Sequence, residues 1–416
     1  MNEGFLLGKI KVNKEIDLST FVSVTGTTNE QIQKATGLPD LSALMEKMET
    51  RASVVKTDIL VPNQCNQKCP GCFYEHDGVC PLKKINQETI NQVDELIEIL
   101  SKIDKNPYLY PREATTNTSL KILPEYKKVG MKSILTNGKT LTNPKVITAL
   151  KDAEINDLTI TVPGLAESYA IYTGEPIDQY EKILDGIKTA IENGFKVSTF
   201  MPIFEKNIYD VIPTVDVLSK LGVSSVNFIR VIPVGNARNL PDDFFIKKES
   251  ITPFLSQVNQ ARLQYKSMKL SLFGQSFGPN FFSPGVWKYL AGQSNEWPGT
   301  KYMCPAINQS YLGVILGTNE IVACFEGMCF DDQKIGIINK DGKVIIDTNN
   351  TDRSEDVLRE KLKGSCSKDE CPYQSLCLGG CRTAAMAEAM RRGEPEPEFA
   401  GQTICITQIL SEKFGL

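Results

Sequence analysis

The chain has 416 residues, of which 41% are hydrophobic, and its formal net charge is -4. This length suits two or three domains with buried cores, and the slightly acidic charge argues against extended nucleic-acid binding. No signal sequence and no stretch of about eighteen uninterrupted apolar residues is present, so we expect a cytoplasmic protein that does not enter a membrane.

Residues 1–53 come before the first predicted strand, and we expect them to form a small N-terminal cap. From residue 54 to residue 275, short β-branched runs alternate with amphipathic helical stretches, which predicts repeated βα units and a parallel α/β sheet. The predicted strands are Val54–Val61, Tyr108–Tyr110, Lys132–Leu135, Asp157–Val162, Lys196–Met201 and Ser225–Ile229. In such sheets ligands collect at the carboxyl ends of the strands.

A loop with three cysteines follows the first predicted strand, in the order Cys65-Asn-Gln-Lys-Cys69-Pro-Gly-Cys72. Three thiolates can bind three irons of a [4Fe-4S] cluster and leave the fourth iron open to a small chelating ligand. Zinc is the alternative metal, but it prefers four ligands and usually paired cysteine knuckles. Twelve cysteines and one histidine in a cytoplasmic chain favour thiol-based metal or redox chemistry over disulfides and imidazole sites.

This cysteine spacing, with an aromatic residue after the third cysteine, resembles the signature of the radical S-adenosylmethionine (radical SAM) enzymes. The resemblance implies a partial (β/α)6 TIM-like barrel in residues 54–275. It also implies reductive cleavage of S-adenosylmethionine (SAM) to a 5'-deoxyadenosyl radical that abstracts hydrogen from a substrate. Phe73 and Tyr74 directly follow the loop and would pack either against the adenine or within the barrel mouth.

Later loops resemble further SAM contacts of that family. Glu113 matches the carboxylate that holds the methionyl amino group, although Tyr110-Pro-Arg-Glu-Ala-Thr-Thr lacks the usual Gly-Gly-Glu-Pro; a surface carboxylate is the alternative. Thr136 and Asn137 belong to a Thr-Asn-Gly turn that the family uses close to the ligand. Arg230, at the end of the sixth strand, matches an arginine near the SAM carboxylate or ribose; an ordinary strand-end salt bridge is its alternative.

Residues 276–303 contain both tryptophans among glycines and prolines, which is typical of a substrate lid or an interdomain linker. Residues 304–416 carry a second cysteine population that resembles the SPASM extension, which holds two auxiliary [4Fe-4S] clusters and would bring the total to three. Two departures are a four-residue gap before Cys371, where two are usual, and Asn319 in place of glycine.

The resemblance implies two ligand sets for these auxiliary clusters. Cys304, Cys324 and Cys381 would hold the nearer cluster, with Cys329 either its fourth ligand or an ordinary buried thiol. The outer cluster would take Cys366, Cys371, Cys377 and Cys405. Cys80 is expected to be an unligated thiol, and Cys80 or Cys329 could donate hydrogen if the reaction were an epimerisation.

We therefore expect a radical SAM oxidoreductase that modifies a peptide by a thioether, a cross-link or dehydrogenation. The alternative is a dehydrogenase or tailoring enzyme that acts on a small molecule such as an amino sugar or nucleoside. A third class is a non-catalytic iron–sulfur electron carrier or zinc protein. The expected partners are a reductase, flavodoxin or ferredoxin as electron donor and, for a peptide substrate, a separate leader-peptide-binding protein.

Overall fold

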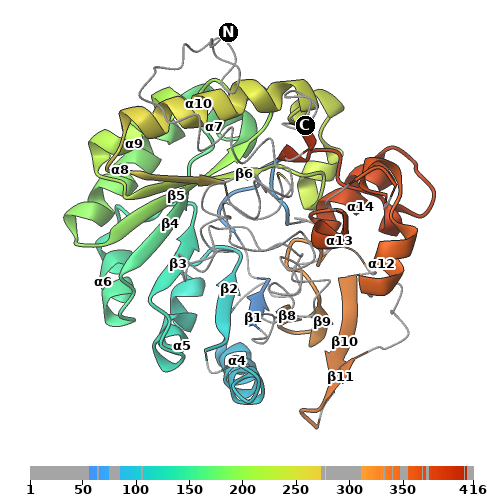
Figure 1. Cartoon of the computed structure of the whole chain (residues 1–416). Helices are drawn as coiled ribbons and strands as arrows, with labels where there is room; N and C mark the ends of the chain where they lie inside the picture. The colour runs from blue at the N-terminus through green and yellow to red at the C-terminus, as the bar shows by residue number, and fades with distance from the viewer. Residues whose placement is uncertain are drawn as a thin grey trace, which may run out of the picture.

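The computed structural model describes most of the predicted barrel and much of the C-terminal region (Figure 1). The described residues are 56–62, 65–74, 85–104, 106–272, 277, 311–328, 330, 333–339, 341–346, 355–367, 369–371, 374–406 and 408–409. The predicted cap, the predicted lid apart from Phe277, and Cys80, Cys304 and Cys329 lie outside them.

One half of the barrel is a five-stranded parallel sheet in the order β3-β4-β5-β6-β7. Its strands are β3 (Ser133–Thr136), β4 (Asp157–Thr161), β5 (Lys196–Ile203), β6 (Ser225–Arg230) and β7 (Lys269–Leu272). The helices of this half, which cover its outer face in Figure 1, are α6 (Pro144–Asp152), α7 (Ala166–Thr173), α8 (Gln179–Glu192), α9 (Val211–Leu221) and α10 (Ile251–Gln264). These βα units are the repeated pattern that the sequence predicts.

The other half is a six-stranded mixed sheet in the order β11-β10-β9-β8-β1-β2. Its strands are β1 (Lys56–Val61), β2 (Tyr108–Pro111), β8 (Tyr311–Ile315), β9 (Glu320–Val322), β10 (Lys334–Ile338) and β11 (Val344–Ile346). Strand β8 pairs in parallel with β1, so the C-terminal region adds a strand directly to the barrel. The remaining helices are α4 (Gln87–Leu100), α5 (Leu123–Lys128), α12 (Glu355–Lys361), α13 (Gln374–Cys377) and α14 (Arg382–Arg391).

The structure confirms the predicted α/β class, and each of the six predicted strands is present with boundaries shifted by one or two residues. The sequence prediction did not include β7 to β11. These strands are three to five residues long, too short for alternation of apolar and polar residues to identify them. None of the described helices is long and apolar enough to cross a membrane.

The barrel strands bury one face under the helices and turn the other face inward. In β4, Leu158 and Ile160 are fully buried, whereas Thr159 and Thr161 remain partly exposed on the opposite face. Side chains alternate between the two faces of a strand, so the buried set forms the core against the helices. The partly exposed set lines a hollow interior.

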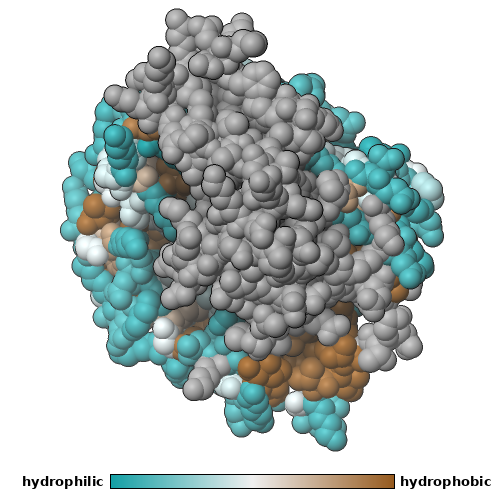
Figure 2. Space-filling view, in the orientation of Figure 1, coloured by the Kyte–Doolittle hydropathy of each residue, from teal (hydrophilic) through white to brown (hydrophobic). Residues whose placement is uncertain are grey.

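The outer surface differs between the two halves of the molecule. Figure 2 shows a mainly hydrophilic surface over the helices of the parallel half and a hydrophobic patch over β10 and β11. The exposed side chains there include Ile337 on β10 and Val344, Ile345 and Ile346 on β11.

Candidate functional site

The three-cysteine loop lies just beyond the carboxyl end of β1 and is shaped by its own backbone. The amide of Cys72 donates to the carbonyl of Cys69 at 3.2 Å. Backbone amides also approach two sulfurs: Gln67 N lies 3.4 Å from Cys65 Sγ, and Tyr74 N lies 3.4 Å from Cys72 Sγ. The three free thiols are partly buried, and the N–H groups directed at sulfur would stabilise thiolates.

Helix α7 holds the loop from one side. The amide of Gly71 donates to the carbonyl of Tyr172 at 3.2 Å, and Gln67 Nε2 donates to the Tyr169 hydroxyl at 2.9 Å. A Cβ atom at Gly71 would lie 2.4 Å from the Tyr172 ring, so a larger residue would push the loop and the helix apart.

The loop after β6 holds the other side. Asn236 N donates to the carbonyl of Tyr74 at 3.1 Å, and Ala237 N donates to that of Cys72 at 3.2 Å. Gly235 has φ +56°, and a Cβ atom there would lie 2.0 Å from the carbonyl oxygen of Phe73. Glycine is therefore required both for the left-handed backbone and for the close approach of the two loops.

Burial raises the pKa of all three thiols. For Cys65 the pKa rises to about 12, because desolvation is reinforced by the negative charge of Glu113. The pKa of Cys69 is raised by desolvation and by repulsion from Cys72 and Cys65. The pKa of Cys72 is raised by desolvation, which its hydrogen bond from Tyr74 opposes.

Buried neighbouring thiols of this kind give up their protons when a metal supplies positive charge. The donor set therefore fits an iron–sulfur cluster that binds three cysteines. Among the residues that the structure describes, no three His, Cys, Asp or Glu side chains converge on a single-ion site. A cubane cluster binds each thiolate through a different iron, so it needs no such convergence.

Glu113 lies at the centre of a buried hydrogen-bond network beside this loop. Its Oε1 accepts from the Thr115 amide at 3.0 Å, the Thr115 hydroxyl at 2.7 Å and the Thr136 hydroxyl at 2.5 Å. Its Oε2 accepts from the Asn137 amide at 2.8 Å. Only 1% of Glu113 is exposed, and burial raises its pKa against the opposing effect of these hydrogen bonds. Glu113 is therefore a buried residue and not the surface carboxylate considered as its alternative.

Asn137 connects this network to the cysteine loop. Its Nδ2 lies 3.6 Å from Cys65 Sγ and donates to Asn66 Oδ1 at 2.6 Å. The structure thus brings Glu113, Thr136 and Asn137 together at the first cysteine, where the sequence prediction placed SAM. Their contact with SAM stays a prediction, and a ligand ammonium at Glu113 would have to exchange with one of the present donors.

Arg230, at the end of β6, forms a buried ion pair with Glu388 on α14. The other carboxylate oxygen of Glu388 accepts from the Thr403 amide at 3.2 Å. The ion pair joins the barrel to the C-terminal region across 158 residues of sequence. This is the strand-end salt bridge that the sequence left as an alternative, whereas a contact of Arg230 with SAM stays a prediction.

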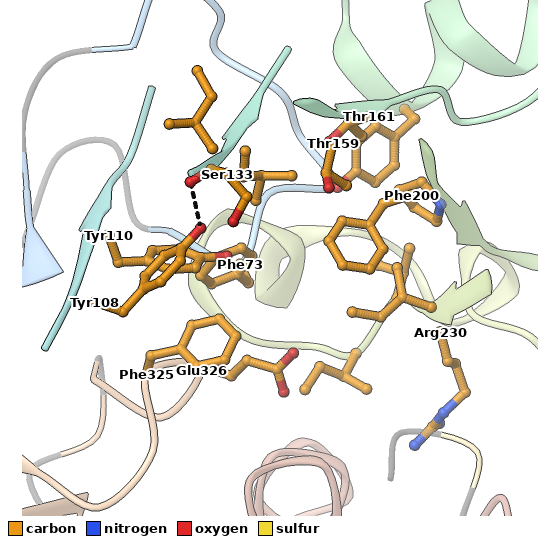
Figure 3. A pocket seen from close by; sticks show the side chains of 18 residues that line it. Phe73, Tyr108, Tyr110, Ser133, Thr159, Thr161, Phe200, Arg230, Phe325 and Glu326 are labelled. Carbon is orange, nitrogen blue, oxygen red and sulfur yellow. Dashed lines mark hydrogen bonds between the residues drawn. The ribbon is translucent and has the colours of Figure 1, made fainter. Parts of the chain in front are cut away.

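A cavity of about 300 Å³ fills the barrel interior next to the cysteine loop (Figure 3). Its wall is largely apolar and includes several aromatic rings, among them Phe73, while Tyr74 is 4% exposed and packs into the adjoining core. The lining residues come from the cysteine loop, from β2 to β6 with adjoining segments, and from the turn after β9: Gly71, Phe73, Tyr108, Tyr110, Ser133, Ile134, Leu135, Thr159, Thr161, Tyr172, Phe200, Pro202, Ile229, Arg230, Val231, Ile232, Phe325 and Glu326. Phe73 thus lies in the barrel mouth, and its packing against adenine stays a prediction.

The turn after β9 brings a carboxyl group to this cavity. Burial raises the pKa of Glu326 to about 7, and the positive charge of Arg230 opposes the shift. Sequence reasoning missed Glu326, Tyr110 and Tyr172 as cavity residues. For Glu326 the only available signal was its position two residues after Cys324, which does not reveal that the turn reaches the barrel interior.

The C-terminal region brings together four of the predicted cluster ligands. Burial raises the pKa of the Cys377 thiol, and repulsion from Cys405, Cys366 and Cys371 adds to the shift, so these three thiols lie within electrostatic reach of Cys377. A Cβ atom at Gly401 would lie 2.6 Å from Cys366 Sγ, so the backbone there passes directly behind that thiol. These four are the cysteines that the sequence assigned to the outer cluster, an assignment that stays a prediction.

Cys381 lies at the start of α14. It caps the N-terminus of α14, where Ala384 N lies 3.5 Å from its sulfur, and it packs with Ile232 and Val234 from the segment after β6. Cys324 follows β9, close to Tyr311. Because Cys304 and Cys329 lie outside the described residues, the nearer cluster set remains a prediction.

Comparison with known proteins agrees with this geometry. Residues 59–233 match the family model of the radical SAM superfamily. These residues run from β1 to β6 and include the cysteine loop and the Glu113 network described above, and the match supports an enzyme.

Relatives over the greater part of the chain are distant. An AdoMet-dependent heme synthase of Methanosarcina barkeri is 21% identical over 351 residues, which cover 80% of this chain and 92% of that protein. The structure of Streptococcus suis SuiB bound to precursor peptide SuiA matches with a TM-score of 0.60 and 15% identity, over 97% of this chain and 92% of SuiB. The enzyme anSMEcpe with bound AdoMet and Cp18Cys peptide matches with a TM-score of 0.60 and 15% identity, over 86% of this chain and 96% of that one. At these identities the two structures support the fold.

Proposed function

We propose that the radical SAM domain of this chain oxidatively modifies a peptide, with its C-terminal cysteines binding two auxiliary [4Fe-4S] clusters. The product would be a thioether, a cross-link or a dehydrogenated residue. The observation that carries the proposal is the three-cysteine loop, held from both sides at the mouth of a hollow barrel and adjoining a cavity of about 300 Å³.

A cluster held by Cys65, Cys69 and Cys72 would supply one electron for the reductive cleavage of SAM, and thereby the radical chemistry that removes hydrogen from the substrate. Around it, the backbone amides of Gln67 and Tyr74 stabilise the thiolates, and Asn137 fixes the position of Cys65. The aromatic cavity wall excludes water from the reacting centre and holds the target carbon in place. The chain's own contribution is therefore mainly positioning.

The cavity of about 300 Å³ has room for one amino-acid side chain. The peptide-bound structures of SuiB and anSMEcpe, which share this fold, support a peptide substrate. The alternative is a small molecule such as an amino sugar or nucleoside, and the distant relative named as a heme synthase favours this class because heme is not a peptide.

The decisive test is SAM cleavage by anaerobically reconstituted protein. Reduced wild-type protein should release 5'-deoxyadenosine, whereas the triple variant Cys65→Ala, Cys69→Ala, Cys72→Ala should release none and should lose about four irons per chain. Lys68→Ala, an exposed change within the same loop, is the matched control and should behave like wild type. Release of deoxyadenosine by the triple variant would refute the proposal.

A second measurement separates the two substrate classes. Reduced protein and SAM are incubated with peptides encoded next to the gene, and the products are read by mass spectrometry. Loss of two hydrogens from a peptide supports the peptide class. Turnover of an amino sugar or nucleoside, with every peptide unchanged, supports the alternative.

A further inference from the structure

One carboxyl group enters the barrel cavity from outside the barrel. Glu326 lies on the turn after β9, and Figure 3 shows its carboxyl group projecting into the cavity beside Phe325 and opposite Phe200. Its neighbours in the chain, Phe325 and Gly327, are also held in place by packing: Phe325 contacts the rings of Phe73 and Tyr110, and Gly327 backs onto Gln333. The carboxyl group is thus presented from a fixed turn.

Within the described part of the chain, Glu326 has neither a hydrogen-bond partner nor an ion-pair partner. Arg230 attracts it at longer range, but the Arg230 guanidinium is ion-paired with Glu388 and points away from the cavity in Figure 3. Glu326 is only partly exposed, and a carboxylate that loses part of its hydration without a close counter-ion is costly. A positively charged ligand group would remove that cost.

A second carboxyl group lies near two tyrosines of the cavity wall. Asp58 on β1 accepts a hydrogen bond from the Tyr311 hydroxyl at 2.8 Å and lies close enough to Tyr108 and Tyr110 to interact electrostatically with both. Tyr110 in turn interacts with Glu326. Asp58 and Glu326 thus both interact electrostatically with Tyr110.

The wall of the cavity suits a cation on an apolar chain. Tyr110 and Phe325 have ring centroids 5.1 Å apart, and Phe73 meets Phe325 edge to face at 5.6 Å. Aromatic faces attract cations through their quadrupoles, while their apolar surface accommodates methylene groups. An anionic group would be repelled here, and a neutral alkyl group would leave Glu326 without a partner.

We propose that this cavity binds a protonated primary amine at the end of an unbranched apolar chain, with Glu326 as its counter-ion and the rings of Phe73, Tyr110 and Phe325 as its wall. A lysine or ornithine side chain of a peptide has this chemistry. This inference rests on the proposed function, because it identifies the substrate side chain that would lie beside the three-cysteine loop.

The test is calorimetric titration of the anaerobically reconstituted full chain with two probes of matched shape. N-acetyl-lysine methylamide carries the amine, and N-acetyl-norleucine methylamide ends in a methyl group. Wild type should bind the lysine probe roughly tenfold to a hundredfold more tightly, the range expected for one charge-assisted hydrogen bond. Glu326→Gln should bring the two affinities together.

Glu320→Gln is the matched control, because Glu320 lies on β9 outside the cavity and is ion-paired with Lys334 at 3.0 Å. It should keep the wild-type preference. Equal binding of both probes by wild type would overturn the proposal, and so would an unchanged preference in Glu326→Gln. The wild-type comparison decides the question by itself if Glu326→Gln does not fold.

Deoxyadenosine release by the same wild-type preparation tests the proposed function separately. Release without any preference for the lysine probe overturns only the amine assignment. A clear preference without release supports amine binding and overturns the proposed radical chemistry.

Discussion

The two cysteine groups of this chain are held in different ways. Cys65, Cys69 and Cys72 occupy eight consecutive residues, are only partly buried, and are held by backbone hydrogen bonds from α7 and from the loop after β6. The C-terminal group spans Cys366 to Cys405, and its members Cys366, Cys377 and Cys405 are buried. The first group is a short loop on a rigid barrel, whereas the second is part of the core of its own region.

The comparison shows that cysteines of the same kind can contribute to the folding of their regions to different degrees. The main barrel core lies between strands and helices and does not include the first three thiols, and Cys72 packs instead against a smaller cluster around Leu60 and Tyr74. The C-terminal core around Leu358, Leu362, Leu378 and Phe399 is small, so the buried cysteines form much of the interior there. Removing thiols should therefore affect chemistry in the first region and folding in the second.

The largest expected effect tests this contrast directly. The double variant Cys366→Ala, Cys377→Ala should lose about four irons per chain and should expose residues 355–409 to proteolysis, because a small core loses the cross-links of its metal centre. Iron analysis and limited proteolysis measure both effects. Met390→Ala, an exposed change on α14, is the control, and an unchanged iron content in the double variant would contradict the predicted ligand set.

The next effect concerns the ion pair that joins the two regions. Glu388→Gln leaves the Arg230 guanidinium buried opposite a neutral group, which should lower the free energy of unfolding by about 3–5 kcal/mol. Denaturant titration under anaerobic conditions measures the change. Glu394→Gln removes an exposed ion pair with Arg392 and should change stability by less than about 1 kcal/mol. Equal effects of the two variants would show that the buried pair does not stabilise the contact between the regions.

The smallest expected effect is a pH-dependent change in stability at the seam where β1 pairs with β8. Burial raises the pKa of Asp58 from 3.8 to about 6, because desolvation outweighs the hydrogen bond from Tyr311. The folded state therefore holds this proton more tightly than the unfolded state, and stability is lost as the pH rises through that interval. Above it, Asp58→Asn should be more stable than wild type by up to about 3 kcal/mol, and the advantage should shrink as the pH falls through the interval.

Thermal unfolding across this pH interval measures the difference. Asp152→Asn, an exposed position on α6, removes the same formal charge and is the control. If Asp58→Asn were less stable than wild type at neutral pH, the ionised Asp58–Tyr311 hydrogen bond would be stabilising the seam, contrary to the expectation.

Much of the barrel could be predicted because the sequence patterns that identify it involve residues close together in the chain. Six strands follow from alternation of β-branched runs with helical stretches, and the three-cysteine loop follows from its spacing after the first of them. The Glu113, Thr136 and Asn137 positions were selected by resemblance to a family, and the structure places them in one network. The pairing of β8 with β1 could not be predicted, because Tyr311 and Lys56 are 255 residues apart in the sequence and the strand is only five residues long.

The sequence by itself determined the α/β order of the barrel and the three closely spaced thiols at the end of its first strand. Both depend on residues near one another in the chain, where periodicity and spacing restrict the geometry. The tertiary structure alone decided that Arg230 pairs with Glu388 and that Glu326 faces an aromatic cavity. Which residues become partners depends on which distant segments pack together. Burial then removes each charged group from water, and this desolvation is costly unless the group has a partner.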